Sequence, residues 1–249
     1  MADPRTAERF FDAAGVLFDL DGVLTPTADL HMHAWAAMFR ALFADHGVEQ
    51  PYTDEDYYLY LDGRPRYDGV QAVLTSRSIS LPYGHPSDPP ETETVCGVGN
   101  RKNGVFFDLL EREGMRPYPG SLRVLDRLQA QGTPVAVVSS SKNAGPVLRA
   151  AGLADRFGVV VDGLVVERDA LPGKPAPDMF LAGARLLGVE PARAVVVEDA
   201  ISGVAAGAAG GFGLVVGVDR GAGPDALTTA GASVVVADLA DLLPASDPS

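Results

Sequence analysis

The chain has 249 residues, of which 47% are hydrophobic and 21% are charged, and its formal net charge is −13 at pH 7. This length and mixture are typical of one large globular domain, or of a core domain with an insert. The acidic balance argues against a protein that binds nucleic-acid backbones, because such binding depends on Lys and Arg. The single cysteine, Cys96, excludes an internal disulfide and a multi-cysteine metal site.

Two apolar features bear on the location of the protein. The first residues contain acids and no apolar run, so we expect no signal peptide. The stretch from Ala200 to Val218 is uncharged and nearly long enough to span a membrane. It is rich in Gly and Ala and directly follows Glu198 and Asp199, so we interpret it as a small-residue helix followed by a buried strand. We therefore expect a cytoplasmic monomer that binds neither membranes nor nucleic acids.

The chain begins with a strand and then becomes helical. We expect residues 1–14 to be a frayed lead-in, with Phe10 and Phe11 packed on the core. An apolar run predicts a strand at 16–20. From residue 28 the apolar residues recur at helical spacing, and the helix is expected to stop at Gly47.

Residues 50–116 differ in character from the rest of the chain. They hold most of the tyrosines and contain no run that indicates a buried strand. We expect three short helices, at 54–61, 67–76 and 102–113, and an irregular loop at 81–99. This block predicts a helical insert.

After Tyr118 the pattern alternates between helices and strands. Nearly continuous Val, Leu and Ala runs between helical segments are typical of a parallel sheet covered by helices on both faces. The expected helices are 121–131, capped by Ser121, 144–151, 176–187 and 202–209. The expected strands are 134–138, 159–161, 194–197, 214–218 and an edge strand at 233–236.

These elements predict an α/β fold, a Rossmann-like parallel-sheet core with helices on both faces and an inserted α-helical cap domain. The first strand belongs to this sheet, so the helical block interrupts a single α/β domain. We place the catalytic core domain at 1–28 and 118–249 and the cap domain at 29–117. No GxGxxG or GxxxxGK segment follows a strand, so a dinucleotide site and a P-loop both lack their signatures.

Two carboxylates follow the first strand. Because side chains of a strand alternate between its faces, Asp19 and Asp21 leave its end on the same side. They repel each other unless a cation or a proton lies between them. Asp and Gly are also common in turns, and an isolated DxDG is more often a turn than a site.

Polar residues in three further stretches bear on this choice. Ser139 begins SSSKN after the second strand of the core, Lys174 lies in GKPAPD, and Glu198 and Asp199 end another strand. Taken singly, the serine could cap a helix, the lysine could be solvated, and the acids could favour a helix N-terminus. Ligands of open parallel sheets bind outside the carboxyl ends of the strands. The joint occurrence of these residues at strand ends therefore favours a functional site.

The set is coherent as a site for phosphoryl transfer. Asp19 and Asp199 supply hard oxygen ligands that suit Mg²⁺. A carboxylate beside that ion can attack phosphorus and form an aspartyl-phosphate. Ser139 and Lys174 would hold the equatorial phosphoryl oxygens, while Asp21 would move protons as a general acid or base.

The four motifs DLDGVLT, VVSSSKN, GKPAPD and VVVEDA resemble those of the haloacid dehalogenase superfamily, and the resemblance covers nearly the whole chain. Within it, TPTADLHMHAW, SSSKN, KPAPDMF and EDAISGV are most similar to the β-phosphoglucomutase family. The resemblance implies a Mg²⁺-dependent enzyme with an aspartate nucleophile and a helical cap. Such an enzyme interconverts β-glucose 1-phosphate and glucose 6-phosphate through a bisphosphate.

The resemblance also implies roles for individual positions. Asp19 would be the nucleophile and Asp21 the acid/base. The metal would be held by Asp19, by the backbone carbonyl of Asp21 and by Asp199, with Glu198 beside it. The implied catalytic residues are Asp19, Asp21, Ser139 and Lys174. The implied substrate-binding residues are Thr27, His31, Gly63, Arg64, Arg66, Lys102, Ser140, Lys142 and Asn143.

Some of these implied roles are more specific. Lys142 and Asn143 match residues that hold the second phosphate of the substrate. Thr27 and His31 match hinge and acid-positioning residues. The segment GRPR at 63–66 resembles the sugar-phosphate loop of the family.

Other residues of interest have simpler interpretations. His31 could be a surface residue on spacing alone, and the remaining histidines are interpreted as ordinary surface residues. We expect Trp35 and Phe39, at helical spacing, to pack in the core rather than form a stacking site. The remaining histidines are His33, His46 and His85.

The sequence also departs from the family pattern. Pro26 stands where an acid is common, Arg64 replaces a small or apolar residue, and the cap is longer around residues 82–93. These changes leave the phosphoryl chemistry intact and leave the preferred sugar open.

Three functions are compatible with the residues. The first is a phosphosugar mutase, and the second is a sugar-phosphate phosphatase with the same nucleophile and metal. A non-enzymatic sensor of sugar phosphates is the third, and the filled catalytic positions weigh against it. A dehalogenase fits less well, because Asp21 is the acid/base that phosphoryl-transfer members carry.

Overall fold

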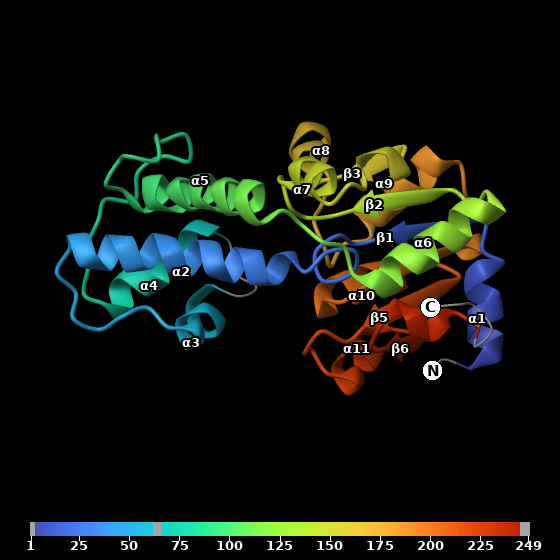
Figure 1. Cartoon of the computed structure of the whole chain (residues 1–249). Coiled ribbons are helices and arrows are strands. Elements are labelled where there is room, and N and C mark those ends of the chain that lie inside the picture. Colours follow the sequence, from blue (N-terminus) through green and yellow to red (C-terminus); the bar gives the residue numbers. More distant parts are fainter. Residues whose placement is uncertain (1–2, 62–65, 245–249) are drawn as a thin grey trace. The chain divides into compact units, whose positions relative to one another are not determined.

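The computed structural model describes residues 3–61 and 66–244, and the chain divides into two compact units (Figure 1). The α/β unit comprises Met1–Pro26 and Met115–Ser249, and the helical unit comprises Thr27–Gly114. The chain thus leaves the first unit after Pro26 and returns to it at Met115, which makes the helical unit an insertion. The described part contains no helix that is both long enough and apolar enough to cross a membrane.

A six-stranded, fully parallel sheet forms the centre of the α/β unit, as the sequence predicted. Its strands are rich in valine and mostly buried, as expected of a sheet covered on both faces. The strand order is β3-β2-β1-β4-β5-β6, so β6 lies at an edge, as predicted. The strands are β1 (Gly15–Phe18), β2 (Val135–Val138), β3 (Val159–Val161), β4 (Ala194–Glu198), β5 (Leu214–Val218) and β6 (Val234–Val236).

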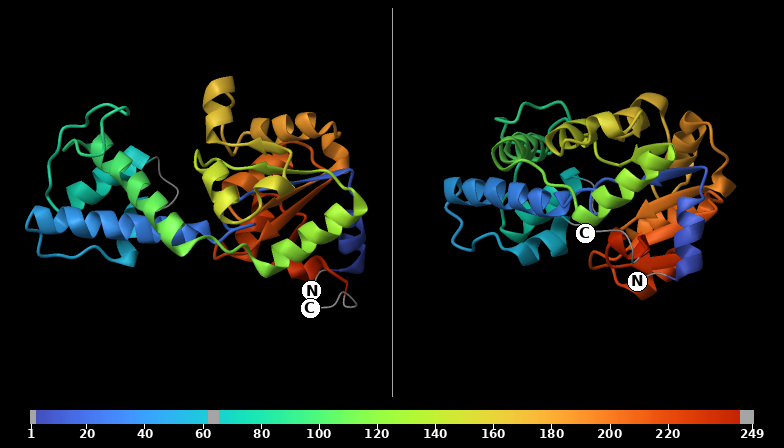
Figure 2. Two further views of the ribbon diagram at one scale, coloured as in Figure 1. Left: turned by 45° about the horizontal axis from the view of Figure 1, so that its top comes forward. Right: turned by 45° about the vertical axis from the view of Figure 1, so that its right-hand side comes forward.

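Helices cover both faces of this sheet (Figure 2). The α-helices of the unit are α1 (Pro4–Phe11), α6 (Pro119–Gln131), α7 (Ala144–Ala150), α8 (Gly163–Asp169), α9 (Asp178–Leu187), α10 (Ile201–Ala209) and α11 (Pro224–Ala230). Short 3₁₀ helices are η2 (Ala154–Arg156), η3 (Pro191–Arg193) and η4 (Leu239–Leu242).

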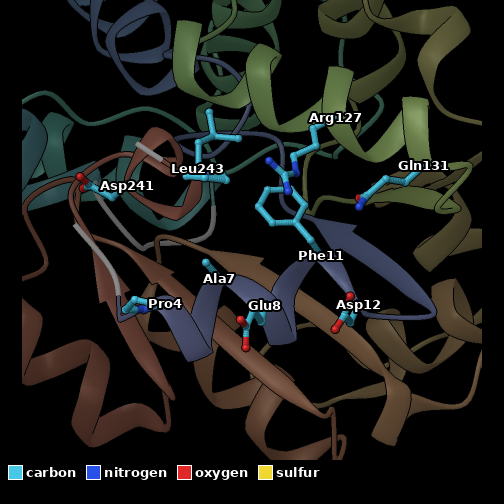
Figure 3. A pocket seen from close by; sticks show the side chains of 10 residues that line it. Pro4, Ala7, Glu8, Phe11, Asp12, Arg127, Gln131, Asp241 and Leu243 are labelled. Carbon is cyan, nitrogen blue, oxygen red and sulfur yellow. The ribbon is translucent and has the colours of Figure 1, made fainter. Parts of the chain in front are cut away.

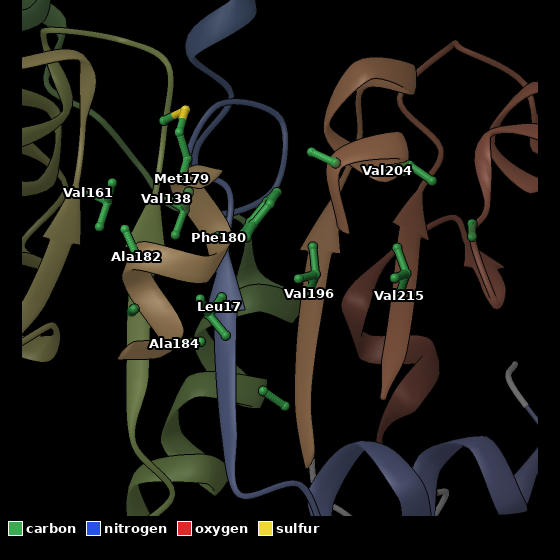
Figure 4. Packing of buried hydrophobic residues seen from close by; sticks show 14 of the residues in the cluster. Leu17, Val138, Val161, Met179, Phe180, Ala182, Ala184, Val196, Val204 and Val215 are labelled. Carbon is green, nitrogen blue, oxygen red and sulfur yellow. The ribbon is translucent and has the colours of Figure 1, made fainter. Parts of the chain in front are cut away.

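The side chains of β1 alternate between the two faces and so reach two different parts of the core. Leu17 joins a buried cluster with Phe180 of α9 and Val196 of β4 on the face covered by α9 and α10 (Figure 4). Its neighbour Phe18 packs edge-to-face with Phe157, at a centroid distance of 6.4 Å. The central position of β1 brings the residues that follow it to the middle of the carboxyl edge of the sheet.

The run from Ala200 to Val218 is a helix, α10, followed by the buried strand β5, as predicted. Small residues let this helix approach the sheet closely. A Cβ on Gly207 would come within 3.0 Å of Val196, so the glycine allows contact that a larger residue would obstruct.

Several local predictions were wrong. The expected frayed lead-in contains helix α1, although Phe10 and Phe11 do pack in the core. Ser121 does not cap its helix, because α6 begins at Pro119 and the buried Ser121 hydroxyl donates to the Val23 carbonyl at 2.6 Å. The short helices α8 and α11 were not anticipated.

The helical unit has its own core, to which helices α2 (Thr27–Asp45), α4 (Arg66–Ser76) and α5 (Val95–Glu113) all contribute buried side chains, most of them from α2. Trp35 and Phe39 stack in this core with ring centroids 5.6 Å apart, which confirms their predicted packing role. The last helix starts earlier than expected, at Val95, because Thr94 caps it by accepting a bond from Gly97 N at 3.0 Å. The unit also contains α3 (Asp54–Asp56) and the π-helical η1 (Tyr57–Leu61).

Candidate active site

The two predicted carboxylates lie in a tight loop that follows β1. Gly22 adopts a positive φ of 80°, and its backbone N donates to the Thr25 carbonyl at 2.8 Å. The Thr25 hydroxyl lies 3.3 Å from the Leu20 carbonyl and donates to it, which closes the loop on itself. The backbone of Asp19 continues the hydrogen-bonding pattern between β1 and β4, because its N donates to the Val197 carbonyl at 2.9 Å. The loop thus fixes the backbone on either side of Asp21.

Lys174 joins carboxylates from two strand ends. Its Nζ lies 2.5 Å from Asp19 Oδ1, 2.7 Å from Glu198 Oε1 and 2.9 Å from the Val138 carbonyl, and it donates to all three. The Lys174 side chain is only 5% exposed, so the solvated alternative for this lysine is wrong. The other Glu198 oxygen accepts from Ala200 N at 2.7 Å, so both oxygens of this carboxylate already have donors.

Ser139 lies at the end of β2 and is fully buried. Its hydroxyl is 3.4 Å from Asp21 Oδ2, a long hydrogen bond, and it accepts from Ser141 N at 3.1 Å. Asn143 is buried next to the start of α7, whereas Lys142 is 53% exposed and pairs with Glu167 at 2.8 Å. The segment therefore brings Ser139 to the carboxylates, and it leaves the Lys142 ammonium in solvent.

Burial and mutual repulsion perturb the carboxylates of this cluster. Burial raises the pKa of Asp19 well above its ordinary value, against the opposing effect of the Lys174 ammonium. Burial, with added repulsion from Glu198 and Asp21, raises the pKa of Asp199 to about 7. For Lys174, burial alone would lower the pKa, but the charges of Asp19 and Glu198 outweigh it and hold that pKa above its usual range. One lysine thus faces more negative charge than it can neutralise.

The oxygen atoms at this edge fit a hard divalent cation. A Cβ on Gly22 would overlap the Asp199 carboxylate, so Asp199 packs directly against the backbone that follows Asp21. Among the described residues, no three His, Cys, Asp or Glu side chains form a ready set of ligands. Mg²⁺ does not need such a set, because it keeps several waters and is often bound through only one or two carboxylates. Two carboxylates and one backbone carbonyl are therefore a suitable donor set.

A second cluster of predicted residues lies within the helical unit. The ring of His31, on α2, stacks on Phe106 of α5 with centroids 4.5 Å apart. Lys102 is only 3% exposed, and its Nζ donates to His31 Nδ1 at 2.5 Å while lying over the Trp35 and Phe106 rings. Burial lowers the pKa of His31 to about 3, with further lowering by Lys102 and then by Arg66. His31 is therefore a neutral acceptor at physiological pH.

Other predicted residues of the helical unit are placed as follows. Arg66 is the first residue of α4, and it donates to Asn103 Oδ1 at 3.0 Å. Thr27 is buried at the start of α2. Gly63 and Arg64 lie outside the described residues. The three histidines interpreted as surface residues, His33, His46 and His85, are exposed.

One arginine near the active-site loop was missed. Arg220 Nε donates to the Gly22 carbonyl at 2.8 Å, and its guanidinium lies over the Tyr118 ring, 3.8 Å from the centroid. A signal was present in the sequence, because Arg220 follows strand β5 closely and so belongs to the carboxyl edge of the sheet.

A separate cavity of about 450 Å³ lies between α1, α6 and the C-terminal segment of the described chain (Figure 3). Phe11 and Arg127 face each other there, with the guanidinium 4.3 Å from the ring centroid. None of the predicted site residues lines this cavity. Its position at α1, which precedes β1, places it away from the carboxyl edge of the sheet.

Known proteins resemble this chain over most of its length. The family model described as haloacid dehalogenase-like hydrolase matches residues 13–211. A beta-phosphoglucomutase from Mycobacterium bovis is 50% identical over 237 residues, which cover 91% of this chain and 90% of that protein. Hexitol phosphatase A from Escherichia coli is 30% identical over 201 residues, 79% of each chain.

The fold has solved counterparts. The crystal structure of a beta-phosphoglucomutase from Clostridium difficile matches with a TM-score of 0.69 and 25% sequence identity, and the match covers 93% of each chain. The residues that the family model matches, 13–211, include Asp19, Ser139, Lys174 and Glu198.

Proposed function

The chain belongs to the haloacid dehalogenase-like hydrolase family, and from this membership we propose that it is a Mg²⁺-dependent enzyme that transfers phosphoryl groups of small phosphosugars. β-Glucose 1-phosphate is the proposed substrate and glucose 6-phosphate the proposed product. The observation that carries the proposal is the contact of buried Asp19 with Lys174 at the carboxyl edge of the sheet. The 50% identity between this chain and a beta-phosphoglucomutase from Mycobacterium bovis, over 90% of that protein, supports the proposed substrate and product.

Asp19 is the proposed nucleophile. Its carboxylate oxygen forms a bond to phosphorus while the bond between phosphorus and the sugar oxygen breaks, which leaves an aspartyl-phosphate. Asp19 must be ionised for this attack, but burial raises its pKa even though Lys174 lowers it, so added positive charge would favour the ionised form. Mg²⁺, held by Asp19, the Asp21 carbonyl and Asp199, would supply that charge and shield the approach of two anions.

Lys174 and Ser139 are the proposed ligands of the transferring phosphoryl oxygens. Both lie at the edge to which Asp19 belongs, and the buried lysine donates to Asp19 itself. Glu198 holds the lysine through Oε1 and is itself fixed by Ala200 N. We therefore propose that Glu198 acts mainly by positioning Lys174, since both of its oxygens are already used.

Asp21 is the proposed general acid and base. It gives a proton to the sugar oxygen as the phosphorus–oxygen bond breaks, and it removes one from the hydroxyl that receives the phosphoryl group. Ser139 lies 3.4 Å from its carboxylate. The tight loop around Gly22 restricts where the Asp21 backbone can move.

Substrate recognition is proposed for a second set of residues. A mutase must hold an anionic sugar phosphate in two orientations, and cations suit its second phosphate. In the helical unit, Arg66 and Lys102 are partly or fully buried, and His31 is a neutral acceptor for a sugar hydroxyl or for Lys102. The remaining proposed substrate-binding residues are Thr27, Gly63, Arg64, Ser140, Lys142 and Asn143.

The compartment and assembly state complete the proposal. We propose that the protein is cytoplasmic, because the single thiol, Cys96, is buried in the helical unit and suits a reducing environment. We also propose that it is a monomer. Thermal behaviour independent of protein concentration would support the monomer.

A coupled assay tests the proposed reaction. Purified protein is given β-glucose 1-phosphate, Mg²⁺ and a trace of the sugar bisphosphate, and glucose 6-phosphate is measured beside released inorganic phosphate. We expect conversion to exceed phosphate release by more than tenfold and to vanish in Asp19→Asn. Release of phosphate without any glucose 6-phosphate would contradict the mutase.

A sugar-phosphate phosphatase is the second candidate. The 30% identity to hexitol phosphatase A from Escherichia coli favours it, because both reactions use the same nucleophile and metal. The two differ in whether water or a sugar hydroxyl receives the phosphoryl group from Asp19. The ratio of the two products in the assay above separates them. A sensor without catalytic function would instead retain its full cellular activity in Asp19→Asn.

A further inference from the structure

The 82–93 loop, the extra length in the helical unit, is fixed to the start of α5 by side chains. Asn100 Nδ2 donates to the carbonyls of Pro86 and Asp88 at 3.0 and 2.9 Å. The Asp88 carboxylate in turn accepts from the Thr94 hydroxyl at 2.6 Å and from His85 N at 3.0 Å. The middle of the loop is therefore tied to α5 through both backbone and side-chain atoms.

The two ends of the loop are also bound to α5. At one end, the Pro82 carbonyl accepts from Val95 N at 2.9 Å. At the other, Arg101 Nε donates to the Pro90 carbonyl at 2.9 Å. A Cβ on Gly97 would overlap the Thr92 carbonyl, so the loop approaches the helix more closely than a side chain would allow. These contacts are those of a packed element with a defined position.

Tyr67 connects this loop to Arg66. The Tyr67 hydroxyl donates to Asn100 Oδ1 at 3.0 Å and lies 3.3 Å from the Pro86 carbonyl. The amide nitrogen of Asn100 thus contacts the loop, and the amide oxygen of Asn100 contacts Tyr67. Asn103 follows Asn100 by three residues in α5, and its side-chain oxygen accepts a hydrogen bond from the Arg66 guanidinium at 3.0 Å. Residues three apart share one face of a helix, so α5 presents both contacts to the first turn of α4.

The surroundings of Arg66 leave it little freedom. A Cβ on Gly99 would lie 2.9 Å from the Tyr67 ring and 3.3 Å from Arg66 Cδ, so both side chains cover the backbone of α5 closely. Burial lowers the pKa of Arg66, and the electrostatic interaction with the Tyr67 side chain opposes that lowering. A guanidinium held in this way loses less freedom when it binds an anion than one free in solvent.

We propose that the 82–93 loop is a brace that holds Arg66, through Asn100 and Tyr67, in the orientation that binds the second anionic group of the substrate. The inference rests on the proposed function, in which Arg66 binds substrate. Tyr67 and Asn100 are positioning residues, because they act on substrate only through Arg66. The loop then determines which phosphosugars bind well, and the chemistry at Asp19 does not depend on it.

Two variants break the brace at different points. Tyr67→Phe removes the hydroxyl and keeps the ring over Gly99, and Asn100→Ala removes both bonds to the loop carbonyls. Each is expected to raise the KM for β-glucose 1-phosphate about tenfold, the size of one lost hydrogen bond, with kcat within about twofold of the parent. Phosphorylation of Asp19 by acetyl phosphate, which has no sugar, should proceed at the parental rate.

A matched control and a double variant sharpen the test. Tyr83→Phe also deletes a tyrosine hydroxyl, from the loop itself, but the Tyr83 side chain is 52% exposed, and the KM of this variant should stay at the parental value. Because Tyr67 and Asn100 act in one chain of contacts, the double variant should raise KM by less than the product of the single effects.

Four outcomes are distinguishable. A parental KM in both Tyr67→Phe and Asn100→Ala would overturn the brace, as would an equal loss of sugar-free phosphorylation, which indicates general damage to the protein. Absence of mutase turnover in the unmodified protein would overturn the proposed function itself. A raised KM in both variants with unchanged phosphorylation by acetyl phosphate would establish the brace.

Discussion

Replacement of Lys174 by methionine is the most direct test of the active-site electrostatics. Methionine keeps the length and apolar body of the side chain but removes the ammonium that contacts Asp19 and Glu198 at 2.5 and 2.7 Å. Both carboxylates are almost completely buried and would lose their cation. Breaking a buried ion pair by removing one partner costs about 3–5 kcal/mol, so the free energy of unfolding should fall by that amount at pH 7.5.

The sign of the pH dependence follows from Asp19. Its pKa is already raised in the folded protein, mainly by burial, and the loss of Lys174 removes the one cation that opposes this. A carboxyl whose folded pKa is raised above the unfolded value stabilises the protein at low pH and loses that contribution as pH rises. The loss in free energy of unfolding caused by Lys174→Met should therefore be smaller at pH 5 than at pH 7.5, by about 1 kcal/mol or more.

Chemical unfolding with a chelator present, at both pH values, measures this deficit. Lys142→Met is the matched control, because that lysine is exposed and its pair with Glu167 should contribute no more than about 1 kcal/mol. Adding Glu198→Gln to Lys174→Met should recover part of the stability and none of the Asp19 phosphorylation. A deficit below 1 kcal/mol that does not change with pH would refute the reasoning.

Three further substitutions test other parts of the structure. His31→Gln should remove a pH-dependent contribution to stability, because burial lowers the pKa of His31 to about 3, below its unfolded value near 6.5. Between pH 7.5 and pH 5 the free energy of unfolding should therefore fall by about 2 kcal/mol more in the parent than in the variant. Arg220→Met should lower kcat about tenfold with KM little changed, because it releases the Gly22 carbonyl beside Asp21. Gly203→Ala should cost about 1–3 kcal/mol, because a Cβ there would overlap the Glu198 carboxylate.

Each of these substitutions has its own control or contrary result. Equal pH dependence in the parent and in His31→Gln would mean that the histidine is protonated in the folded protein. A change in KM alone for Arg220→Met would mean that the arginine affects binding rather than the loop around Asp21. Gly104→Ala makes the same change as Gly203→Ala at an open helical position and should stabilise the protein by about 0.5–1 kcal/mol.

The sheet was predictable from sequence because its signal is repeated. Each strand of the α/β unit is a short apolar run that contains valine and lies between helical segments, and the edge position of the last strand followed from its place in the chain. The unexpected helices have weaker signals. Helix α8 has only seven residues and is followed by Ala170 with a positive φ, so the helix is too short for a helical periodicity to be recognised. Helix α1 did carry start signals that we overlooked, Asp3 as N-cap and Pro4 at the first turn.

The candidate site was predictable as a set of positions at the edge of the sheet but not as a set of contacts. The rule that ligands bind at the carboxyl ends of parallel strands was enough to group Asp19, Ser139 and Glu198. It could not show that Lys174 lies between two of these carboxylates, because that lysine precedes a helix rather than ending a strand. The contact depends on tertiary packing that no local pattern encodes.

Glu198 shows how this chemistry shapes the neighbouring helix. The carboxylate accepts from Lys174 and from Ala200 N, and it occupies the space beside Gly203 where any side chain would stand. Further along α10, Gly207 has only about 3 Å of clearance from Val196. Two glycines of the run that resembles a membrane span are therefore needed for close approaches, Gly203 to a buried carboxylate and Gly207 to the sheet. Enlarging Gly203 should therefore disturb Lys174 through Glu198, whereas enlarging Gly207 should disturb the packing of α10 on the sheet.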